Sequence, residues 1–229
     1  MTGIDWGHVS EALDAQGCGL LPGLLGKDEC ADLVAAWDER RRFRSEVVMA
    51  RHGYGQGVYR YFDYPLPARV AELRAALYPP LARIANRWSE ALGTGVVYPP
   101  EHEAFLERCR AAGQTRPTPL LLRYETGDWN ALHQDVYGDL VFPLQVAVLL
   151  SHPAEDFTGG EFVLAEQRPR QQSRAEVVPL GRGDAVVFPV RERPARGSRG
   201  WHRRAMRHGV SRVRSGLRVT LGIIFHDAR

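Results

Sequence analysis

Short apolar segments separated by turn residues dominate the second half of the chain. From Thr118 onward, runs rich in apolar and β-branched residues alternate with Gly, Pro or Asp. The runs are PLLLRYE, LVFPLQVAVLLS, GEFVLAE, AEVVPL, DAVVFPV and LRVTLGIIF. Segments of this length and composition are typical of β-strands. Six or more strands within about 110 residues predict a sandwich or a jelly roll.

The first half of the chain has a helical pattern instead. Apolar residues recur at helical spacing from Cys30 to Trp37, and Asp28 is a residue that can cap this helix. The run Arg40-Arg41-Arg42 follows, and its positive charge suits the C-terminal end of a helix dipole. We therefore expect a helix that starts at Asp28 and ends near the arginines.

Prolines and glycines divide the rest of the first half. Two helices are predicted at 68–77 and 81–92, separated by Pro79-Pro80, and a third at 101–112. The segment GCGLLPGLL predicts a short strand and turn, and the Gly/Tyr-rich stretch between Arg51 and Tyr64 predicts a loop with a strand. Helices need a sheet to pack on, so we expect a helix-rich part, 1–117, to form one unit with a β-rich part, 118–229.

Composition is typical of a globular protein with a sizeable core. The 229 residues are 44% hydrophobic and 25% charged, which suits one domain. No apolar run is long enough for a membrane span, and the first residues lack the features of a signal peptide, so we expect a cytoplasmic protein. The three cysteines suit neither a disulfide framework nor a zinc site, and are expected to be buried reduced thiols.

Positive charge is concentrated near the C-terminal end of the chain. Between Arg191 and Arg214 there are nine arginines and one acid, Glu192, for a local charge of +8. Since the whole chain carries +3, the remainder carries about −5. Only one of the 30 basic residues, Lys27, is a lysine. Because arginine is used throughout this chain, the presence of an arginine at one position is weak evidence for a specific binding role.

The sequence His133-Gln134-Asp135 is the first candidate for chemistry. In an extended strand successive side chains alternate between faces, so His133 and Asp135 point the same way. One imidazole and one carboxylate side by side make up two-thirds of the facial triad that binds non-haem Fe(II).

A second signal lies near the C-terminus. His208 follows His133 by 75 residues, and Arg218 follows His208 by ten. Arg218 and Thr220 alternate with apolar residues, so both share one face of a strand. An arginine directed inward from an apolar strand needs a buried anionic partner, and a dicarboxylate with one end on the metal meets that need.

These residues together resemble the Fe(II)/2-oxoglutarate-dependent dioxygenase superfamily, especially its prolyl-hydroxylase-like branch. The supporting motifs are RYETGDW before the HQD sequence, DFTGGEF at 156–162 and GRGDAVVFP at 181–189. More narrowly, GDWNALHQDVYGDLVFPLQVAVLL and the closing RHGVSRVRSG and LGIIFHDA are similar to a bacterial family described as AlkB-like, with a proposed role in repair of alkylated DNA. The RxNxTxR pattern usual in AlkB-type proteins is absent.

The resemblance implies an α+β fold with a double-stranded β-helix core, a jelly roll similar to that of cupins. It also implies an enzyme that uses Fe(II), 2-oxoglutarate and O2, coupling decarboxylation of 2-oxoglutarate to C–H hydroxylation. The implied iron ligands are His133, Asp135 and His208. Arg218 is implied to bind 2-oxoglutarate, with Tyr124 and Thr220 as further candidates.

Other residues are weaker candidates. The substrate mouth could be lined by residues near the HQD sequence or in the Gly/Tyr-rich stretch, namely Trp129, Asn130, Tyr137, Arg60 and Tyr61. His202 is a rival iron ligand, rejected because the arginine ten residues later does not open an apolar strand. His226 is expected at the surface or in C-terminal packing, and Glu161 in a hairpin. We expect no ligand role for the remaining histidines, His8, His52, His102 and His152.

Two substrate classes, and one reading without chemistry, stay open. The arginine-rich segment from Arg191 to Arg214, with Trp201 within it, suits a nucleic acid carrying an alkylated base, although it could equally be a solvated loop. The ten-residue spacing between His208 and Arg218 favours hydroxylation of a protein side chain or a small metabolite. A cupin-like binding module without chemistry is the third alternative, and the intact motif argues against it.

Overall fold

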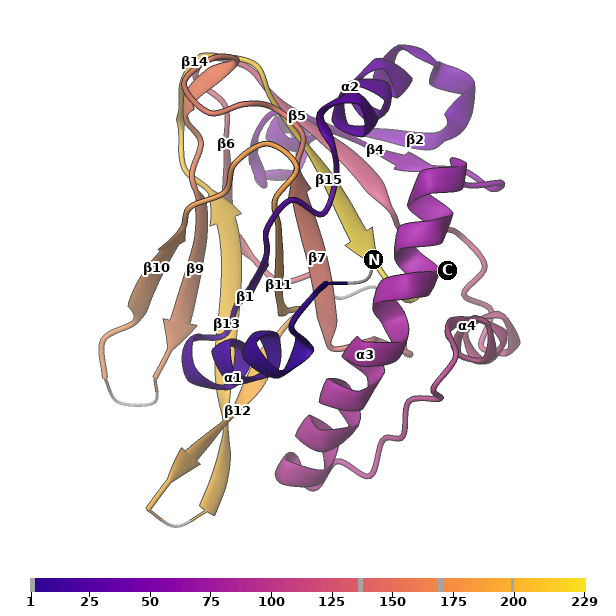
Figure 1. Cartoon of the computed structure of the whole chain (residues 1–229), viewed down its shortest axis with the longest axis vertical. Coiled ribbons are helices and arrows are strands. Elements are labelled where there is room, and N and C mark those ends of the chain that lie inside the picture. Colours follow the sequence, from indigo (N-terminus) through magenta and orange to yellow (C-terminus); the bar gives the residue numbers. More distant parts are fainter. Residues whose placement is uncertain (1–2, 136–137, 169–170, 199) are drawn as a thin grey trace.

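Two β-sheets face each other, and helices cover the outer side of the larger one (Figure 1). The computed structural model describes residues 3–135, 138–168, 171–198 and 200–229. The larger sheet has seven strands in the order β1 (Gly19–Leu21), β11 (Ala185–Pro189), β7 (Leu144–Leu149), β15 (Arg218–Ile224), β5 (Leu120–Tyr124), β4 (Val58–Phe62) and β2 (Phe43–Val48).

The smaller sheet faces it across the core. Its strand order is β10 (Arg174–Val178), β9 (Phe162–Gln167), β13 (Gly200–Val210), β6 (Trp129–His133) and β3 (Gly55–Gln56), with β12 (Glu192–Gly197) also paired to β13. A further pair joins β8 (Phe157–Gly159) to β14 (Val213–Gly216). Neighbouring strands in both sheets run antiparallel. This confirms the prediction of an α+β fold built on a jelly roll.

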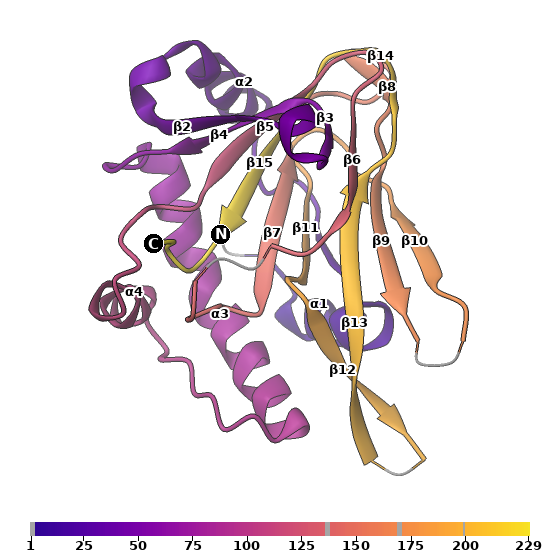
Figure 2. The ribbon, with the colours of Figure 1, turned by 180° about the vertical axis from the view of Figure 1, so that it is seen from behind.

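The helices come from the first half of the chain. They are α1 (Trp6–Gln16), α2 (Lys27–Ala35), α3 (Ala68–Leu92) and α4 (His102–Ala111), with short 3-10 helices η1 (Ala36–Asp38), η2 (Arg40–Arg42) and η3 (Met49–His52). The long helix α3 lies along the larger sheet. The view from behind shows β6 and β13 of the smaller sheet on the side of β7 and β15 that faces away from α3 (Figure 2). The helix predicted at 101–112 is confirmed as α4.

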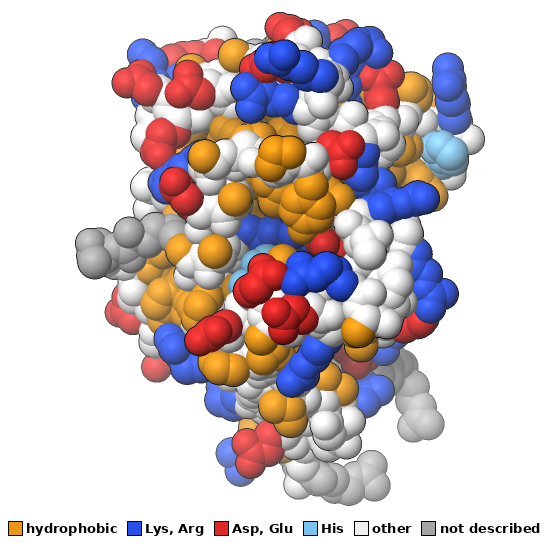
Figure 3. Space-filling model, turned by 90° about the vertical axis from the view of Figure 1, so that its right-hand side faces the viewer, with side chains coloured by type: hydrophobic (Ala, Val, Ile, Leu, Met, Phe, Trp, Pro, Cys, Tyr) orange, Lys and Arg blue, Asp and Glu red, His pale blue; other side chains and the backbone are white. Residues whose placement is uncertain are grey.

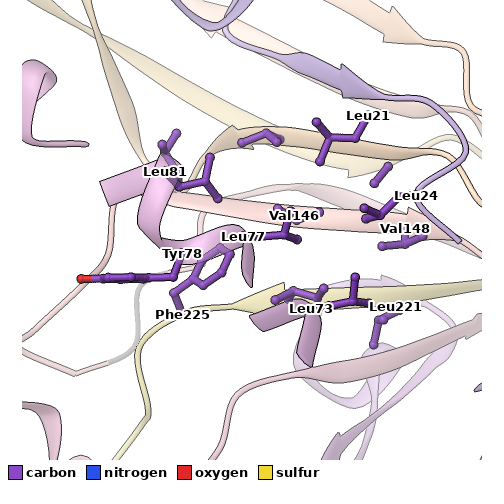
Figure 4. Close-up of a cluster of buried hydrophobic side chains, with 14 of the residues drawn as sticks. Leu21, Leu24, Leu73, Leu77, Tyr78, Leu81, Val146, Val148, Leu221 and Phe225 are labelled. Carbon is purple, nitrogen blue, oxygen red and sulfur yellow. The ribbon is translucent and has the colours of Figure 1, made fainter. Parts of the chain in front are cut away.

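The main core lies between α3 and the larger sheet (Figure 4). Leu73 and Leu77 of α3 belong to the same buried cluster as Val146 and Val148 of β7 and Leu221 of β15. All six residues of β7 are buried, because one face meets the helix and the other faces the interior between the sheets. Side chains on that second face are therefore available to line a cavity.

Helix α3 continues through two prolines. The sequence predicted separate helices on either side of Pro79-Pro80, but one helix spans both residues. Proline removes a hydrogen-bond donor and strains the preceding turn. Leu77, Leu81 and Pro80 are nevertheless buried against the sheet, and this continuous apolar contact stabilises the uninterrupted helix.

The start and end of α2 also differ from the prediction. Its N-cap is Gly26, whose backbone N–H donates to the Glu29 carboxylate at 2.8 Å, so Asp28 lies inside the first turn and is not the cap. Trp37 lies in η1, and the three arginines form η2 instead of ending α2. Apolar spacing alone did not distinguish a continuous helix from a helix followed by two 3-10 turns.

Strands lie outside the predicted segments as well as within them. Each of the six predicted runs contains a strand, and β1 and β4 lie in GCGLLPGLL and the Gly/Tyr-rich stretch, where strands were also predicted. β2 of the larger sheet lies where no strand was predicted. The arginine-rich segment forms β12 and β13, where no strand was predicted. The three cysteines are free and buried, as expected. Among the described residues, no helix combines the length and the apolar character needed to cross a membrane.

Candidate metal centre and its cavity

Two strands of the smaller sheet bring three potential metal ligands together. His133 ends β6 and is the cross-strand neighbour of His208 on β13. Asp135 lies two residues beyond the end of β6, so it is not on the strand as the sequence suggested. One ligand atom from each residue lies within 4.8 Å of the others. The Asp135 carboxylate oxygens lie 3.4 Å from His133 Nε2 and 3.2 Å from His208 Nε2.

The surroundings of the histidines favour coordination through Nε2. His133 Nδ1 lies 2.8 Å from the carbonyl oxygen of Ala131, which can only accept, so Nδ1 carries the proton. The lone pair of His133 is then on Nε2, which faces Asp135. The His208 ring is buried, with its centroid 4.7 Å from that of Phe188 and 6.0 Å from that of Phe162.

Asp135 is held in its ionised form. Burial opposes its ionisation, but hydrogen bonds with His133 and His208 keep the pKa of the carboxyl group well below its ordinary value. Burial likewise opposes protonation of His133, yet the bond to Asp135 raises the pKa of its imidazole. Two imidazoles and one carboxylate on one side of a common point are the ligand set of non-haem Fe(II), and they leave the other side open.

Gln134, between the two ligands, attaches this segment to the neighbouring strand. Its Nε2 donates to the carbonyl oxygens of Arg191 and Met206, each at 2.9 Å. Gln134 also lines the cavity beside His133 and Asp135. The sequence offered no signal for this attachment, because both partners are backbone groups distant in sequence.

A cavity of about 290 Å³ extends between the sheets from the three ligands to Arg218. Arg218 is 2% exposed, and its Nη1 donates to Thr220 Oγ1 at 2.5 Å. Its Nε is buried without a hydrogen-bond partner, and no carboxylate of the described residues forms an ion pair with it. Burial lowers the pKa of Arg218 to about 10, so the guanidinium remains charged at neutral pH. A charged group in this position requires an anion from outside the chain.

Tyr124 forms the wall beside this guanidinium. It is fully buried, and its ring centroid lies 5.5 Å from Arg218 Cζ. Its hydroxyl oxygen accepts a hydrogen bond from Asn130 Nδ2 at 3.2 Å. Burial raises the pKa of Tyr124 to about 12, so the phenol keeps a proton that it can donate. Asn130, predicted for the substrate mouth, lines the cavity and also orients Tyr124.

Three other predicted substrate residues lie elsewhere. Arg60 is buried, with Nε donating to Glu46 at 2.7 Å and Nη1 to the Trp37 carbonyl oxygen at 2.6 Å, so it does not line the cavity. Tyr61 packs in a separate cluster at the edge of the larger sheet. Trp129 is 41% exposed and is also not part of the cavity wall. Tyr137 lies outside the described residues.

The alternation of side chains along β4 determines which residues of the Gly/Tyr-rich stretch reach the cavity. Along β4, alternation sends Arg60 to the face opposite Tyr59 and Tyr61. Tyr59 lines the cavity in their place. Further lining residues that the sequence did not indicate are Tyr54, Gln145, Ala147, Phe162, Phe188 and Val210.

The remaining histidines are not part of the ligand cluster in the described residues. His202 lies on β13 opposite Ala195, six residues from His208. His226 is buried and its Nδ1 accepts from the Phe142 backbone N–H at 3.2 Å, which fits a packing role and not a surface position. His102 is also buried and hydrogen-bonds the Phe225 carbonyl oxygen at 2.8 Å.

The arginine-rich segment is a pair of strands leading into the centre. Arg193 and Arg204 form ion pairs with the buried Glu166. Arg203 and Arg207 point outward from β13, and Arg203 pairs there with Glu192 at 3.4 Å. Trp201 is exposed on that same outward face. Elsewhere charge is mixed, since basic and acidic side chains are interspersed over the face shown in Figure 3.

Comparisons with known proteins agree with this geometry. Residues 57–228 match the model of the family Oxygenase-NA, described as "Oxygenase, catalysing oxidative methylation of damaged DNA". The chain is 50% identical over 192 residues to an uncharacterized protein of Mycobacterium tuberculosis, covering 82% of both chains.

Solved structures share the fold at low sequence identity. A prolyl-4-hydroxylase from Pseudomonas putida aligns with a TM-score of 0.56 and 16% identity, over 98% of this chain and 99% of that one. An oxidoreductase of the 2OG-Fe(II) oxygenase family from Burkholderia pseudomallei aligns with a TM-score of 0.56 and 18% identity, over 99% and 93% of the two chains. These likenesses concern the arrangement of strands and helices.

Proposed function

The chain belongs to the Oxygenase-NA family, and from this premise we propose that it is an Fe(II)- and 2-oxoglutarate-dependent dioxygenase. The supporting observation is one cavity that holds both the His133–Asp135–His208 cluster and the buried Arg218 without a carboxylate partner among the described residues. The three clustered residues would hold Fe(II), and Arg218 would bind the distal carboxylate of 2-oxoglutarate.

Bound Fe(II) supplies oxidative decarboxylation of 2-oxoglutarate by O2, coupled to hydroxylation of a C–H bond in the primary substrate. The protein orders the reactants around it. Arg218 and Thr220 provide donors at the deep end of the cavity, and the Tyr124 hydroxyl has a proton to donate beside them. Phe162 and Phe188 flank His208 with apolar surface, which limits the access of water to the reacting groups.

The substrate class that we propose is an N-methylated base in a nucleic acid. Hydroxylation of an N-methyl group gives a product that falls apart to formaldehyde and the free amine. The family description names damaged DNA. The outward face of β13, opposite to the face of His208, carries Arg207 directly before His208, and Arg203 and Trp201 further along the strand. Arginines of this kind bind phosphates, and an exposed indole can stack on a base.

A second candidate is hydroxylation of a protein side chain or a small metabolite. Two observations favour it, namely the ten-residue spacing between His208 and Arg218 and the likeness of the fold to the prolyl-4-hydroxylase. In that case the product would be a stable alcohol, and no formaldehyde would form.

One assay distinguishes these functions. Purified protein with Fe(II), 2-oxoglutarate and O2 is offered methylated single-stranded oligonucleotides, proline-containing peptides and free amino acids, and succinate and formaldehyde are measured. We expect succinate and formaldehyde with the oligonucleotides, and loss of both in the variant His133→Ala. Succinate with peptides alone would support the second candidate. Absence of succinate under all conditions would contradict the oxygenase assignment and favour a binding module.

A further inference from the structure

Gln145 is a buried polar residue of the cavity that does not belong to the His133–Asp135–His208 cluster. It lies on β7, is 3% exposed and lines the same cavity as the three ligands. Its Nε2 is buried and has no hydrogen-bond partner in the described part of the chain. A buried amide donor without a partner is destabilising, because it has lost its hydrogen bonds to water. A ligand in the cavity that accepts this hydrogen bond would remove the penalty.

The register of the larger sheet places Gln145 away from the co-substrate anchor. On one side its neighbour is Ile224 of β15, six residues along that strand from Arg218, or about 20 Å at about 3.3 Å per residue. On the other side its neighbour is Phe188 of β11, whose ring centroid lies 4.7 Å from that of His208. Gln145 is therefore close to the centre but at the opposite end of the cavity from Arg218.

The surroundings of Gln145 restrict what it can recognise. Phe188, paired with Gln145 across β7 and β11, offers aromatic surface beside it, and Leu120 and Tyr59 line other parts of the same cavity. A carboxamide presents a donor and an acceptor side by side, and a glutamine can pair in this way with the edge of adenine. Aromatic surface beside one such pair of polar groups suits a flat ring with hydrogen-bonding atoms on its edge.

We propose that Gln145 determines specificity for the primary substrate by pairing its carboxamide with the edge of the base that enters the cavity. This inference rests on the proposed function and deepens it, because it names the group that reads the base. The phosphate contacts of the outward arginines would then supply affinity, and Gln145 would supply selectivity.

The test measures binding apart from turnover. Anaerobic protein loaded with Fe(II) and 2-oxoglutarate is titrated with fluorescein-labelled single-stranded DNA containing one N-methylated adenine, and with the same strand carrying thymine at that position, by fluorescence anisotropy. We expect Gln145→Leu to weaken binding of the methylated strand about tenfold or more and to change binding of the thymine strand less than about twofold.

Two further variants control for loss of packing. Gln145→Glu keeps the size of the side chain but replaces the amide donor by an acceptor, so it is also expected to lose the preference for the methylated strand. Gln167→Leu changes an exposed glutamine at the end of β9 and is expected to behave as the unaltered protein. Thermal unfolding of each variant checks that it is folded.

Three outcomes separate the inference from the proposed function. If both Gln145 variants keep the preference, or if they lose affinity for 2-oxoglutarate instead, the assignment of Gln145 is wrong. If the unaltered protein does not distinguish the strands but turns over a peptide or an amino acid, the nucleic-acid substrate is wrong. The pairing of Gln145 with a base is then wrong as well. A raised KM for that substrate in Gln145→Leu would still support Gln145 as a specificity residue, and an unchanged KM would overturn that role too.

Discussion

Four arginines are buried among the described residues, and only one lacks a carboxylate partner there. Arg60 pairs with Glu46, Arg74 with Asp227 at 2.7 Å, and Arg193 with Glu166. These three stabilise the chain internally. Arg218 has Thr220 as its hydrogen-bond acceptor but forms no ion pair with a carboxylate of the described residues. At the scale of single residues, this contrast is the strongest sign that Arg218 serves a ligand.

The first prediction concerns this guanidinium. Replacement of Arg218 by Lys keeps the charge but removes the planar pair of donors that binds a carboxylate through both oxygens. We expect the KM for 2-oxoglutarate in succinate formation to rise about 10- to 100-fold. Arg110→Lys, an exposed change on α4, is the matched control and should leave the KM within about twofold. An unchanged KM in Arg218→Lys would remove Arg218 from the co-substrate site.

At the scale of elements, the centre depends on how β6, β12 and β13 are held together. Gln134 attaches the end of β6 to backbone carbonyls at Arg191 and Met206. Glu166 of β9, only 1% exposed, accepts from Arg193 of β12 and from Arg204 of β13, the latter at 2.6 Å. The hydrogen bonds of Gln134 and the ion pairs of Glu166 lie outside the His133–Asp135–His208 cluster. They connect the strands that carry His133 and His208, so they help to position these two residues relative to each other.

A second prediction follows for Gln134. The variant Gln134→Leu removes both hydrogen bonds to the neighbouring strands while leaving every proposed ligand in place. We expect the affinity for Fe(II) or for Mn(II) as a substitute to fall about 10- to 100-fold, as is usual when residues that orient ligands are lost. Calorimetric titration with Mn(II) measures this directly. Gln56→Leu, an exposed change on β3, serves as the control, and equal affinities in both variants would contradict a positioning role for Gln134.

The third prediction concerns stability and pH. Burial opposes ionisation of Glu166, but hydrogen bonds and charge from Arg168, Arg193 and Arg204 lower its pKa from 4.5 to about 2. A carboxylate with a depressed folded-state pKa stabilises fully above its unfolded pKa, and this stability is lost as the pH falls through 4.5 towards 2. Glu166→Gln should therefore lower the free energy of unfolding by about 3 kcal/mol at pH 7.

Urea unfolding over a pH series checks this prediction. The difference between the unaltered protein and Glu166→Gln should shrink as the pH falls from about 5 to about 3. Glu103→Gln breaks an exposed ion pair with Arg110 and should change stability by less than about 1 kcal/mol. A difference between the two proteins that does not depend on pH would mean that packing, and not charge, is lost in Glu166→Gln.

At the scale of the whole molecule, charge and topology act together. Within the segment from Arg191 to Arg214, which has a local charge of +8, Arg193 and Arg204 share the single carboxylate of Glu166. On the outward face of β13, Arg203 pairs with Glu192 at 3.4 Å, and Arg207 is exposed. The face in Figure 3 mixes both signs of charge, so a continuous basic surface is not found there.

The fourth prediction uses salt to count phosphate contacts. Replacing both Arg203 and Arg207 by Ala should weaken binding of unmodified single-stranded DNA. The slope of log K against log salt should become less negative by about 0.7 for each phosphate contact removed. Arg83→Ala, an exposed change on α3, should leave the slope unchanged. A slope that is the same in all three proteins would show that the outward face of β13 does not contact nucleic acid.

The sequence alone determined six apolar strands of the second half, the α+β class and the residues His133, Asp135 and His208 that the fold brings together. It could do so because alternation and short apolar runs are local properties of the chain. The spacing of His133, Asp135, His208 and Arg218 is a chemical signature that is readable without coordinates.

Only the tertiary structure decided which residues complete the cavity. Gln145, Phe188 and Tyr59 come from three strands that are distant in sequence and are brought into one sheet by antiparallel pairing. It also decided that α3 runs through two prolines, because burial against the sheet outweighs a local preference. Local patterns indicate which way a side chain points, but what it meets there depends on segments elsewhere in the chain.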